Sequence, residues 1–409
     1  MSTTDPGMAD RSANDLSRRV RALAMSPTMG MAQRAASLTA KGEEVLDFSV
    51  GEPDQPPPAQ VTAATIAALE AGKTRYTNAA GIPELRAAVA LRYKKDFRVS
   101  FAEPEVAITS GGKQALYLVC QALLDRADEV IIPSPHWPSF SEAVRLAGAR
   151  PILVQAQEKD GFRVTARMIG KATSPRTKAV ILNSPCNPTG AVIDPDDLLV
   201  IGDMAQRRKF TLLWDDTYGR LSFDRTESGA LQALRDAVGD RFVILGSASK
   251  TYSMTGWRIG WMLGPRALVD ACAALVSHST QCPTAFAQVG AVEALTGPQR
   301  FVQDTVAEYK RRRDFIHGAI SALPRVTCVE PAGGLYLFPN VGRYLNAKVP
   351  TTLEMAIRLL EQKKVAVVPG EAFASPGYLR LSYARPMGQL KLGVERIASF
   401  LVELQASGR

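Results

Sequence analysis

Short apolar runs that alternate with helical patterns constrain the fold of this chain more than any other feature of its sequence. Each run has the length of a strand, is rich in Val, Ile and Leu, and is apolar on both faces. Strands of a largely parallel sheet that is covered by helices have this pattern. The sequence therefore predicts an α/β fold, with a three-layer αβα large domain and a mostly parallel sheet. The runs are residues 106–109, 130–133, 151–154, 179–182, 211–214, 242–245 and 259–263.

The pattern changes on either side of this region. Residues 1–15 are predicted to form a flexible arm, and residues 17–41 show an amphipathic helical pattern. We predict a large domain over residues 61–309, and a smaller α+β domain in which residues 16–60 join residues 310–409. The expected elements late in the chain are helices at 267–277, 286–296, 299–322, 351–362 and 390–405, and strands at 326–329, 335–338, 365–368 and 378–383.

Composition excludes several classes of protein. The chain has 409 residues, 46% hydrophobic and 22% charged, as expected of a globular protein with a full core. No apolar run approaches the length of a membrane helix, and the N-terminus has no apolar secretory segment, so we expect a cytoplasmic protein with no membrane partner. The five cysteines form no CxxC pair and the three histidines lie far apart, so no metal is expected. The net charge of +9 is dispersed, which predicts no nucleic-acid partner.

Polar residues follow most of the predicted strands, at the point where each strand ends. In open parallel sheets, ligands bind beyond the carboxyl ends of the strands. Several such segments at one edge are hard to explain by structure alone, so we expect the functional site there. The segments are residues 110–113, 134–137, 183–190, 215–218 and 246–250.

Two of these segments carry residues suited to a phosphate. Gly111 and Gly112 lie between a strand and an apolar helix, where glycines let backbone N–H groups approach an anion; a plain tight turn is the alternative. Ser247, Lys250 and Arg258 lie within twelve residues of one another. Hydroxyls and a guanidinium suit a phosphate dianion. A partly desolvated lysine beside cations can form a Schiff base, although most lysines lie on the surface.

Other residues of these segments have both a functional and a structural interpretation. Asp215 ends an apolar strand, where an acid is costly without a partner such as a protonated pyridine nitrogen, or it caps the next helix. Asn187 lies in a turn bounded by prolines that its side chain could stabilise. Trp137 and Tyr218 could be packing residues, as aromatic residues often are.

The order and spacing of several motifs resemble those of the class I aminotransferases, which are pyridoxal-phosphate enzymes of fold type I. The motifs are NSPCNPTG at 183–190, DDTY at 215–218, SASKTYSMTGWRIG at 247–260 and YLRLSYA at 378–384. GEPD, YTNAAGIPELR and SGGKQALY place the likeness closest to the bacterial aspartate aminotransferases. The resemblance extends from about residue 16 to residue 404.

This resemblance implies a role for each matching residue toward the cofactor pyridoxal 5'-phosphate. Lys250 forms the Schiff base, Asp215 pairs with the ring nitrogen, and Trp137 stacks on the ring. Asn187 and Tyr218 bond the ring oxygen. Tyr76 reaches the phosphate of the neighbouring subunit, so a homodimer is implied. The residues implied around the phosphate are Gly111, Gly112, Lys113, Ser247, Ser249 and Arg258.

The resemblance also implies how a substrate is bound. Arg380 holds the α-carboxylate as a bidentate fork, and the residues implied to assist it are Gly51, Trp137 and Asn187. Ser26, Thr28 and Lys113 match positions that recognise an acidic side chain. The chain departs from the family pattern at His136, at Cys186 and in the loop 55–58, none of which removes a catalytic group.

The leading interpretation is a transaminase that uses aspartate or a similar acidic donor with a 2-oxo acid such as 2-oxoglutarate. Enzymes with the same cofactor but an aromatic or specialised donor, or with β-lyase, decarboxylase or racemase activity, remain alternatives. A cofactor-binding transcription regulator is a third class. It requires an added helix-turn-helix domain, and only about 15 residues precede the family match.

Overall fold

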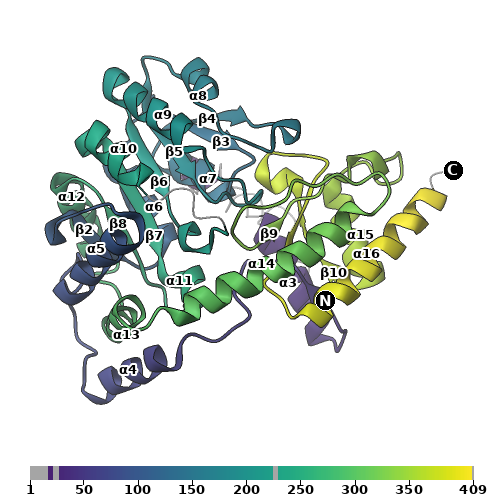
Figure 1. Ribbon diagram of the computed structural model, residues 1–409, viewed down its shortest axis with the longest axis horizontal. Coiled ribbons are helices and arrows are strands. Elements are labelled where there is room, and N and C mark those ends of the chain that lie inside the picture. The colour runs from purple at the N-terminus through teal and green to yellow at the C-terminus, as the bar shows by residue number, and fades with distance from the viewer. Residues whose placement is uncertain (1–16, 22–26, 224–228, 408–409) are drawn as a thin grey trace, which may run out of the picture.

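The computed structural model describes residues 17–21, 27–223 and 229–407 (Figure 1). The predicted arm at 1–15 lies outside the described residues. Among the described residues, no helix combines the length and the apolar character needed to span a bilayer.

The central element is a seven-stranded sheet with helices on both faces (Figure 1). β8 runs antiparallel to both of its neighbours, and all other adjacent pairs are parallel. The predicted α/β fold with a mostly parallel sheet is confirmed. In spatial order the strands are β2 (Val106–Thr109), β8 (Gly260–Leu263), β7 (Phe242–Ser247), β6 (Thr211–Asp215), β5 (Thr177–Asn183), β3 (Glu129–Ser134) and β4 (Arg150–Gln155).

Alternate residues of each central strand enter two separate hydrophobic cores. In β6, Leu212 and Trp214 face one core and Leu213 faces the other, and all three are fully buried. This explains why the runs are apolar at every position. The first core is covered by α4 (Ala59–Glu70), α5 (Pro83–Phe97), α8 (Ala166–Ala172), α9 (Pro195–Arg208), α10 (Ala230–Val238) and α13 (Ala285–Thr296). The second is covered by α6 (Gly112–Leu123), α7 (Pro138–Leu146) and α12 (Arg266–Ser277).

Strand β4 departs from the prediction that every run is buried on both faces. It lies at the edge of the sheet and pairs only with β3. Leu153 is 43% exposed. β2 at the opposite edge of the sheet is buried at every position, so edge position alone does not set the exposure of β4.

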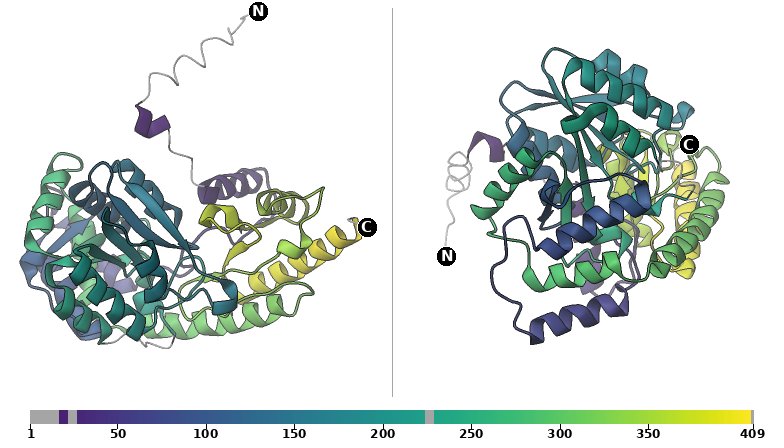
Figure 2. Two further views of the ribbon diagram at one scale, coloured as in Figure 1. Left: turned by 90° about the horizontal axis from the view of Figure 1, so that it is seen from above. Right: turned by 60° about the vertical axis from the view of Figure 1, so that its left-hand side comes forward.

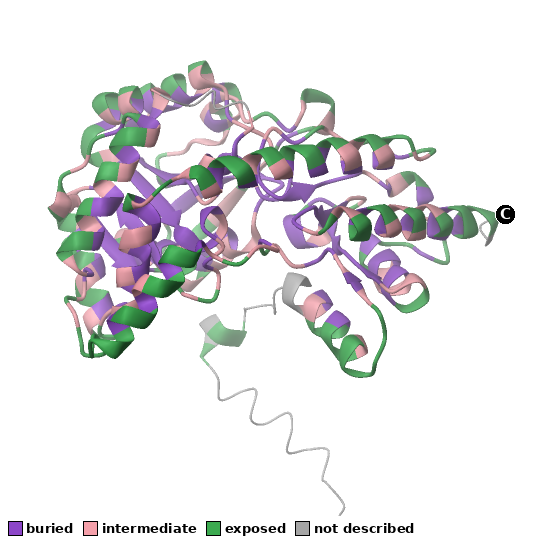
Figure 3. Cartoon of the chain, turned by 60° about the horizontal axis from the view of Figure 1, so that its bottom comes forward, coloured by how far each residue is buried: buried purple, intermediate pink, exposed green. Residues whose placement is uncertain are grey.

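A further hydrophobic core lies beside the sheet and combines residues from both ends of the chain (Figure 3). β1 (Leu46–Asp47) pairs with β10 (Val365–Ala366), and a small antiparallel sheet contains β11 (Val368–Pro369), β12 (Leu379–Ser382) and β9 (Tyr336–Leu337). The helices around it are α3 (Pro27–Ala40), α14 (Arg300–Ser321), α15 (Thr352–Lys363) and α16 (Met387–Ser407).

Two sequence predictions for this region are corrected. The strand expected at 326–329 is a single bridge between Thr327 and Asn340, and the strand expected at 365–368 is split into β10 and β11 because it pairs with two different sheets. The helix expected over 17–41 comprises α2 (Arg18–Arg21) and α3, with residues 22–26 outside the described part.

Helix α14 extends along both parts of the molecule (Figure 2). Val302 near its start packs in the first core under the large sheet, whereas Tyr309, Ile316 and Ile320 pack in the core beside it. The predicted domain boundary at 309/310 therefore falls inside a continuous helix, and the division into two domains stays a prediction. The remaining short elements are α11 (Ala248–Thr251) and the 3₁₀ turns at Glu103–Glu105, Glu158–Asp160, Gly219–Leu221, Gly239–Arg241, Gly342–Tyr344 and Gly370–Phe373.

Candidate active site

A cavity of 340 Å³ lies at the carboxyl ends of β5, β6 and β7, where the sequence predicts the site. Its volume is that of a small-molecule pocket. The predicted site residues that line it are Gly51, Gly112, Lys113, Trp137, Asn187, Asp215, Tyr218, Ser247, Ser249, Lys250, Arg258 and Arg380. Six further residues line it: Ala32, Ser49, Val50, Asn183, Thr217 and Tyr336.

The reversed direction of β8 brings Arg258 to this edge of the sheet. Gly260 pairs with Ser247 on one side and with Thr109 on the other. The start of β8 therefore lies beside the ends of β2 and β7. Arg258, which precedes β8, is thus placed next to the residues that follow those two strands.

The turn before α6 needs glycine because it lies directly against Arg258. Gly111 has a φ of +89°, and a Cβ at this position would overlap the Arg258 guanidinium. A Cβ on Gly260 would overlap the backbone of Gly111 and Gly112. Arg258 donates hydrogen bonds to the carbonyl oxygens of Thr255 (2.6 Å) and Ser110 (3.3 Å). Its guanidinium is therefore fixed beside the N-terminus of the twelve-residue helix α6.

Two hydroxyls complete this part of the cavity. The Ser247 hydroxyl donates to Ser249 Oγ (2.8 Å) and accepts from the Ser249 backbone N–H (3.0 Å). A helix N-terminus, a guanidinium and two hydroxyls together favour a bound dianion.

Lys250 extends into the centre of the cavity. Its Nζ donates a 2.6 Å hydrogen bond to the Gly51 carbonyl oxygen. Burial lowers the pKa of Lys250 to about 8, an effect that Glu52 opposes and the nearby cations Arg380 and Arg258 reinforce. At a pKa of about 8, roughly a tenth of the amine is unprotonated at pH 7, far more than for a lysine with the ordinary pKa, and the unprotonated amine is the nucleophile.

Asp215 is buried at the end of β6, and no ion pair within the described residues includes it. The Thr217 backbone N–H donates to its Oδ1 (2.9 Å). Burial raises the pKa of Asp215 to about 6, although the Thr217 hydrogen bonds oppose this. A buried carboxylate of this kind is suited to a ligand that presents an N–H⁺ group.

Asn187 and Tyr218 face the cavity from neighbouring strand ends. The Asn183 side chain accepts from the Asn187 backbone N–H (2.9 Å) and donates to the Asp215 carbonyl (3.1 Å), which ties the two loops together. The hydroxyls of Tyr218 and Tyr336 are 3.0 Å apart. Burial, and then the proximity of Tyr336, raises the pKa of Tyr218 well above its ordinary value, so this phenol stays protonated and can donate.

Arg380 of β12 closes the cavity from the side opposite β6. Its Nη2 donates to the Ser49 carbonyl (2.7 Å) and its Nη1 donates to Asn187 Oδ1 (3.1 Å). Its Nε is buried and has no hydrogen-bond partner within the described structure. Burial lowers the pKa of Arg380 from its ordinary high value. A guanidinium with unused donors in a cavity fits a ligand carboxylate.

Lys113 and Trp137 lie on a further wall. The Lys113 Nζ is 5.0 Å from the centroid of the Trp137 ring. Burial, with a smaller contribution from Arg258, lowers the pKa of Lys113. Lys113 therefore adds a positive charge to a cavity that already contains two guanidinium groups.

Some predicted residues do not join this cavity. Tyr76 is 82% exposed and does not line the cavity of its own chain, and Gly111 lies against Arg258 without lining the cavity. Ser26 lies outside the described residues, and so does the side chain of Thr28 at the start of α3. His136 is buried beside the site, with its Nε2 2.6 Å from Ser141 Oγ.

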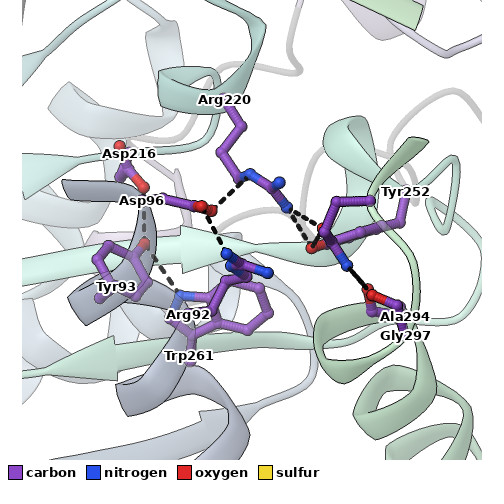
Figure 4. Close-up of polar contacts among 10 residues, drawn as sticks. Arg92, Tyr93, Asp96, Asp216, Arg220, Tyr252, Trp261, Ala294 and Gly297 are labelled. Atoms are coloured by element: carbon purple, nitrogen blue, oxygen red, sulfur yellow. Dashed lines mark hydrogen bonds and ion pairs between the residues drawn. The ribbon is translucent and has the colours of Figure 1, made fainter. Parts of the chain in front are cut away.

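A buried polar network supports the loop that carries Asp215 and Tyr218 from behind (Figure 4). The Tyr93 hydroxyl donates to Asp216 Oδ2 (2.7 Å) and accepts from the indole Nε1 of Trp261 (3.2 Å). The side chain of Asp216 is thus held by α5 and β8, on the far side of the loop from the cavity.

A second set of polar contacts lies beside the first and runs through Arg220 to the start of α14 (Figure 4). Arg220 forms an ion pair with Asp96 (2.8 Å), which also pairs with Arg92 (2.7 Å). Arg220 donates to the hydroxyl of Tyr252 and to Gln299 Oε1 (2.7 Å). Through Arg220, this partly buried second set joins the loop after Tyr218 to the segment that follows Lys250 and to the start of α14.

The sequence analysis missed six of the lining residues. Asn183 and Thr217 belong to motifs that were recognised, and Ser49 and Val50 adjoin Gly51, so position next to a motif was a usable signal. Ala32 and Tyr336 carried no such signal. Tyr336 comes from the two-residue strand β9 and reaches the cavity only through the pairing of β9 with β12.

With this geometry described, the comparisons with known proteins identify the class. Residues 43–397 match the family of class I and II aminotransferases, and the chain belongs to that family. It is 38% identical to an aspartate aminotransferase of Geobacillus stearothermophilus, over 94% of this chain and 98% of the relative. It is also 38% identical to a probable aspartate/prephenate aminotransferase of Aquifex aeolicus, over 95% and 99% respectively.

Solved structures agree with this assignment. An aspartate aminotransferase from Thermus thermophilus with maleate is 37% identical, with a TM-score of 0.88, and the match covers 94% of this chain and 99% of that one. The predicted resemblance to the aspartate aminotransferases and the predicted fold type I are confirmed. The protein is an aminotransferase.

Proposed function

We propose that this aminotransferase transfers the amino group of aspartate, or of a similar acidic donor, to a 2-oxo acid such as 2-oxoglutarate, with pyridoxal 5'-phosphate as cofactor. The observation that carries the proposal is the presence of Lys250, Asp215 and Arg380 in one cavity. These residues supply a nucleophilic amine, a buried carboxylate and a guanidinium with unused donors.

The residues present fit this cofactor. The buried carboxylate of Asp215 suits the ring nitrogen, and the hydroxyl of Tyr218 and the amide of Asn187 suit the ring oxygen. The glycine cradle beside Arg258, with Ser247 and Ser249, suits the phosphate. When bound, pyridoxal phosphate supplies an electron sink for the electron pair left at the substrate Cα.

The chain's own residues then have distinct tasks. Arg380 holds the α-carboxylate through its unused N–H donors, which fixes the direction of the Cα–H bond. The Nζ of Lys250 would take the proton from the substrate Cα and deliver it to the cofactor carbon C4′, as transamination requires, and the pKa of about 8 favours the unprotonated amine that acts as the base. Asp215 remains ionised when it pairs with a cation.

An acidic donor is supported by two observations. Lys113 places a positive charge on the cavity wall apart from Arg380, where a second carboxylate can be bound. The relatives are named for aspartate, and the Thermus thermophilus structure contains the dicarboxylate maleate. A relative named for aspartate and prephenate keeps a wider range of donors open to test.

We propose that two chains form the active unit. Tyr76 is 82% exposed, and Tyr117 of α6 and Leu275 of α12 are exposed on adjacent helices. An exposed phenol that contributes nothing to its own cavity is available to the site of a second copy.

All five cysteines are free, and we propose that the enzyme works in the reducing cytoplasm.

Half-reaction spectroscopy tests the proposal. Purified protein loaded with pyridoxal phosphate is mixed with single amino acids, and the cofactor absorbance is followed. We expect aspartate or glutamate to give the fastest change, with formation of the matching 2-oxo acid. In Lys250→Ala, borohydride reduction should no longer fix the cofactor to the chain, and transamination should be lost. The control Lys73→Ala, at an exposed lysine, should retain both properties. Wild-type activity in Lys250→Ala, or release of ammonia with pyruvate, would overturn the proposal.

A further inference from the structure

The side chain of Tyr336 lines the cavity. It is 3% exposed and extends from β9 over the backbone of Gly51, where a Cβ would overlap its hydroxyl. Gly51 is also the residue whose carbonyl accepts the Lys250 hydrogen bond. The phenol therefore has little freedom to move.

The hydroxyl of Tyr336 meets the hydroxyl of Tyr218 at 3.0 Å, and their rings pack edge to face with centroids 5.8 Å apart. Tyr218 has one O–H to donate. If Tyr336 donates to the Tyr218 oxygen, the Tyr218 O–H is free to point into the cavity. Hydrogen bonds in such a chain polarise one another, so the outward donor is strengthened.

The ring of Tyr336 contacts a different group. The Arg380 Cζ lies 4.2 Å from its centroid and 5.0 Å from the centroid of Phe373. Strand register explains this contact: Tyr336 pairs with Ser382, and Arg380 lies on the same face of β12 two residues earlier. A guanidinium between two aromatic faces keeps its plane fixed while its N–H edges stay free.

We propose that Tyr336 is a positioning residue with two separable actions. Its hydroxyl orients the Tyr218 phenol toward the ring oxygen of the cofactor, and its ring orients Arg380 toward the substrate carboxylate. This inference rests on the proposed function, and it assigns a role to a residue that no motif marks.

The two actions can be separated by substitution. Tyr336→Phe keeps the ring and removes the hydroxyl, so it changes only the Tyr218 side. Phe373→Leu removes the other aromatic face of Arg380 and leaves both phenols in place. Tyr336→Leu removes both contacts. Circular dichroism and thermal unfolding of each variant confirm that it folds.

The first readout is the pH at which the absorbance of the Lys250-bound cofactor titrates. A hydrogen-bond donor to the ring oxygen of the cofactor stabilises the anionic form of that oxygen. The nitrogen that joins the cofactor to Lys250 then loses its proton more readily, so its pKa is lower. Weakening that donor in Tyr336→Phe should raise the titration midpoint by roughly 0.3 to 1 pH unit. Phe373→Leu should leave the midpoint unchanged.

The second readout is the KM for L-aspartate, together with the Kd for maleate as a non-reacting dicarboxylate. Loss of one aromatic face should weaken both by about 2- to 30-fold in Phe373→Leu and in Tyr336→Leu. Tyr336→Phe should stay within twofold of the wild type.

The outcomes are distinguishable. A wild type that binds no pyridoxal phosphate overturns the proposed function and this inference with it. A wild type that binds and transaminates, with an unchanged titration midpoint in Tyr336→Phe, overturns the role of the hydroxyl. Unchanged maleate binding in Tyr336→Leu overturns the role of the ring.

Discussion

Replacing Tyr93 with phenylalanine tests whether the buried network behind the site loop stabilises the fold. The Tyr93 hydroxyl donates a hydrogen bond to the Asp216 carboxylate (2.7 Å) and accepts one from the indole N–H of Trp261 (3.2 Å). All three residues are buried. Removing the hydroxyl takes one donor from a buried carboxylate, which costs about 1.5–3 kcal/mol. It also leaves the buried indole N–H without this acceptor, which adds roughly 1 kcal/mol. The expected loss in the free energy of unfolding is about 3 kcal/mol.

Urea unfolding, followed by far-UV circular dichroism at fixed pyridoxal phosphate, measures this loss. The control is Val402→Ala, because Val402 of α16 is 66% exposed and is not among the residues proposed to face a second copy. We expect the control to change stability by less than about 0.5 kcal/mol. Covalent loading of the cofactor should survive in Tyr93→Phe, since the Asp216 backbone N–H still donates to the Leu245 carbonyl (2.8 Å). Equal stability of the two variants would refute the reasoning.

Three further predictions concern single groups of the site. Lys113→Ala should lower kcat/KM for aspartate by about ten- to a hundredfold and leave an apolar donor nearly unchanged; equal losses for both donors in steady-state assays would contradict a role toward the second carboxylate. Burial raises the pKa of Asp215 to about 6, so the folded state loses stability as the pH rises and this carboxyl ionises. In urea unfolding between pH 4 and pH 6, the cofactor-free wild type should lose roughly 2–3 kcal/mol of stability relative to Asp215→Asn. Bound pyridoxal phosphate should remove this pH-dependent difference between the two proteins. A gap that does not vary with pH would argue against a strained carboxylate. When Lys250→Ala protein is mixed with Tyr76→Phe protein, the mixture should be more active than either variant alone. One site of each heterodimer then combines an intact Lys250 with an intact Tyr76 from the other chain. No gain in activity after proven subunit exchange would mean that each site is formed by one chain.

The large sheet was predictable because its strands, apart from the edge strand β4, are largely buried on both faces. Leu212, Leu213 and Trp214 of β6 are all buried, so the sequence shows an uninterrupted apolar run there. A polar residue directly after such a run, such as Asp215, stands out against that background. The same reasoning located Lys250 after β7. The motif resemblance then supplied the roles that spacing alone left open.

Contacts between distant segments were not predictable in this way. Tyr336 lies in a two-residue strand, and its neighbours Arg380 and Tyr218 come from other parts of the chain. The edge position of β4 depends on strand order, which a local pattern does not encode. The split between β10 and β11 likewise reflects pairing partners rather than the residues themselves.

The hydrogen bond from Arg380 to the Ser49 carbonyl joins residues 331 positions apart. At about 5–20 residues per second, a ribosome needs roughly 15 to 70 s to make the intervening chain. In the last roughly 7 to 26 s of that interval, while residues 251–380 are made, the chain already carries Lys250 and Asp215 but not yet Arg380. A nascent chain therefore has the groups that bind a cofactor well before it has the means to bind an amino acid, and its reactivity toward metabolites begins only when synthesis is almost complete.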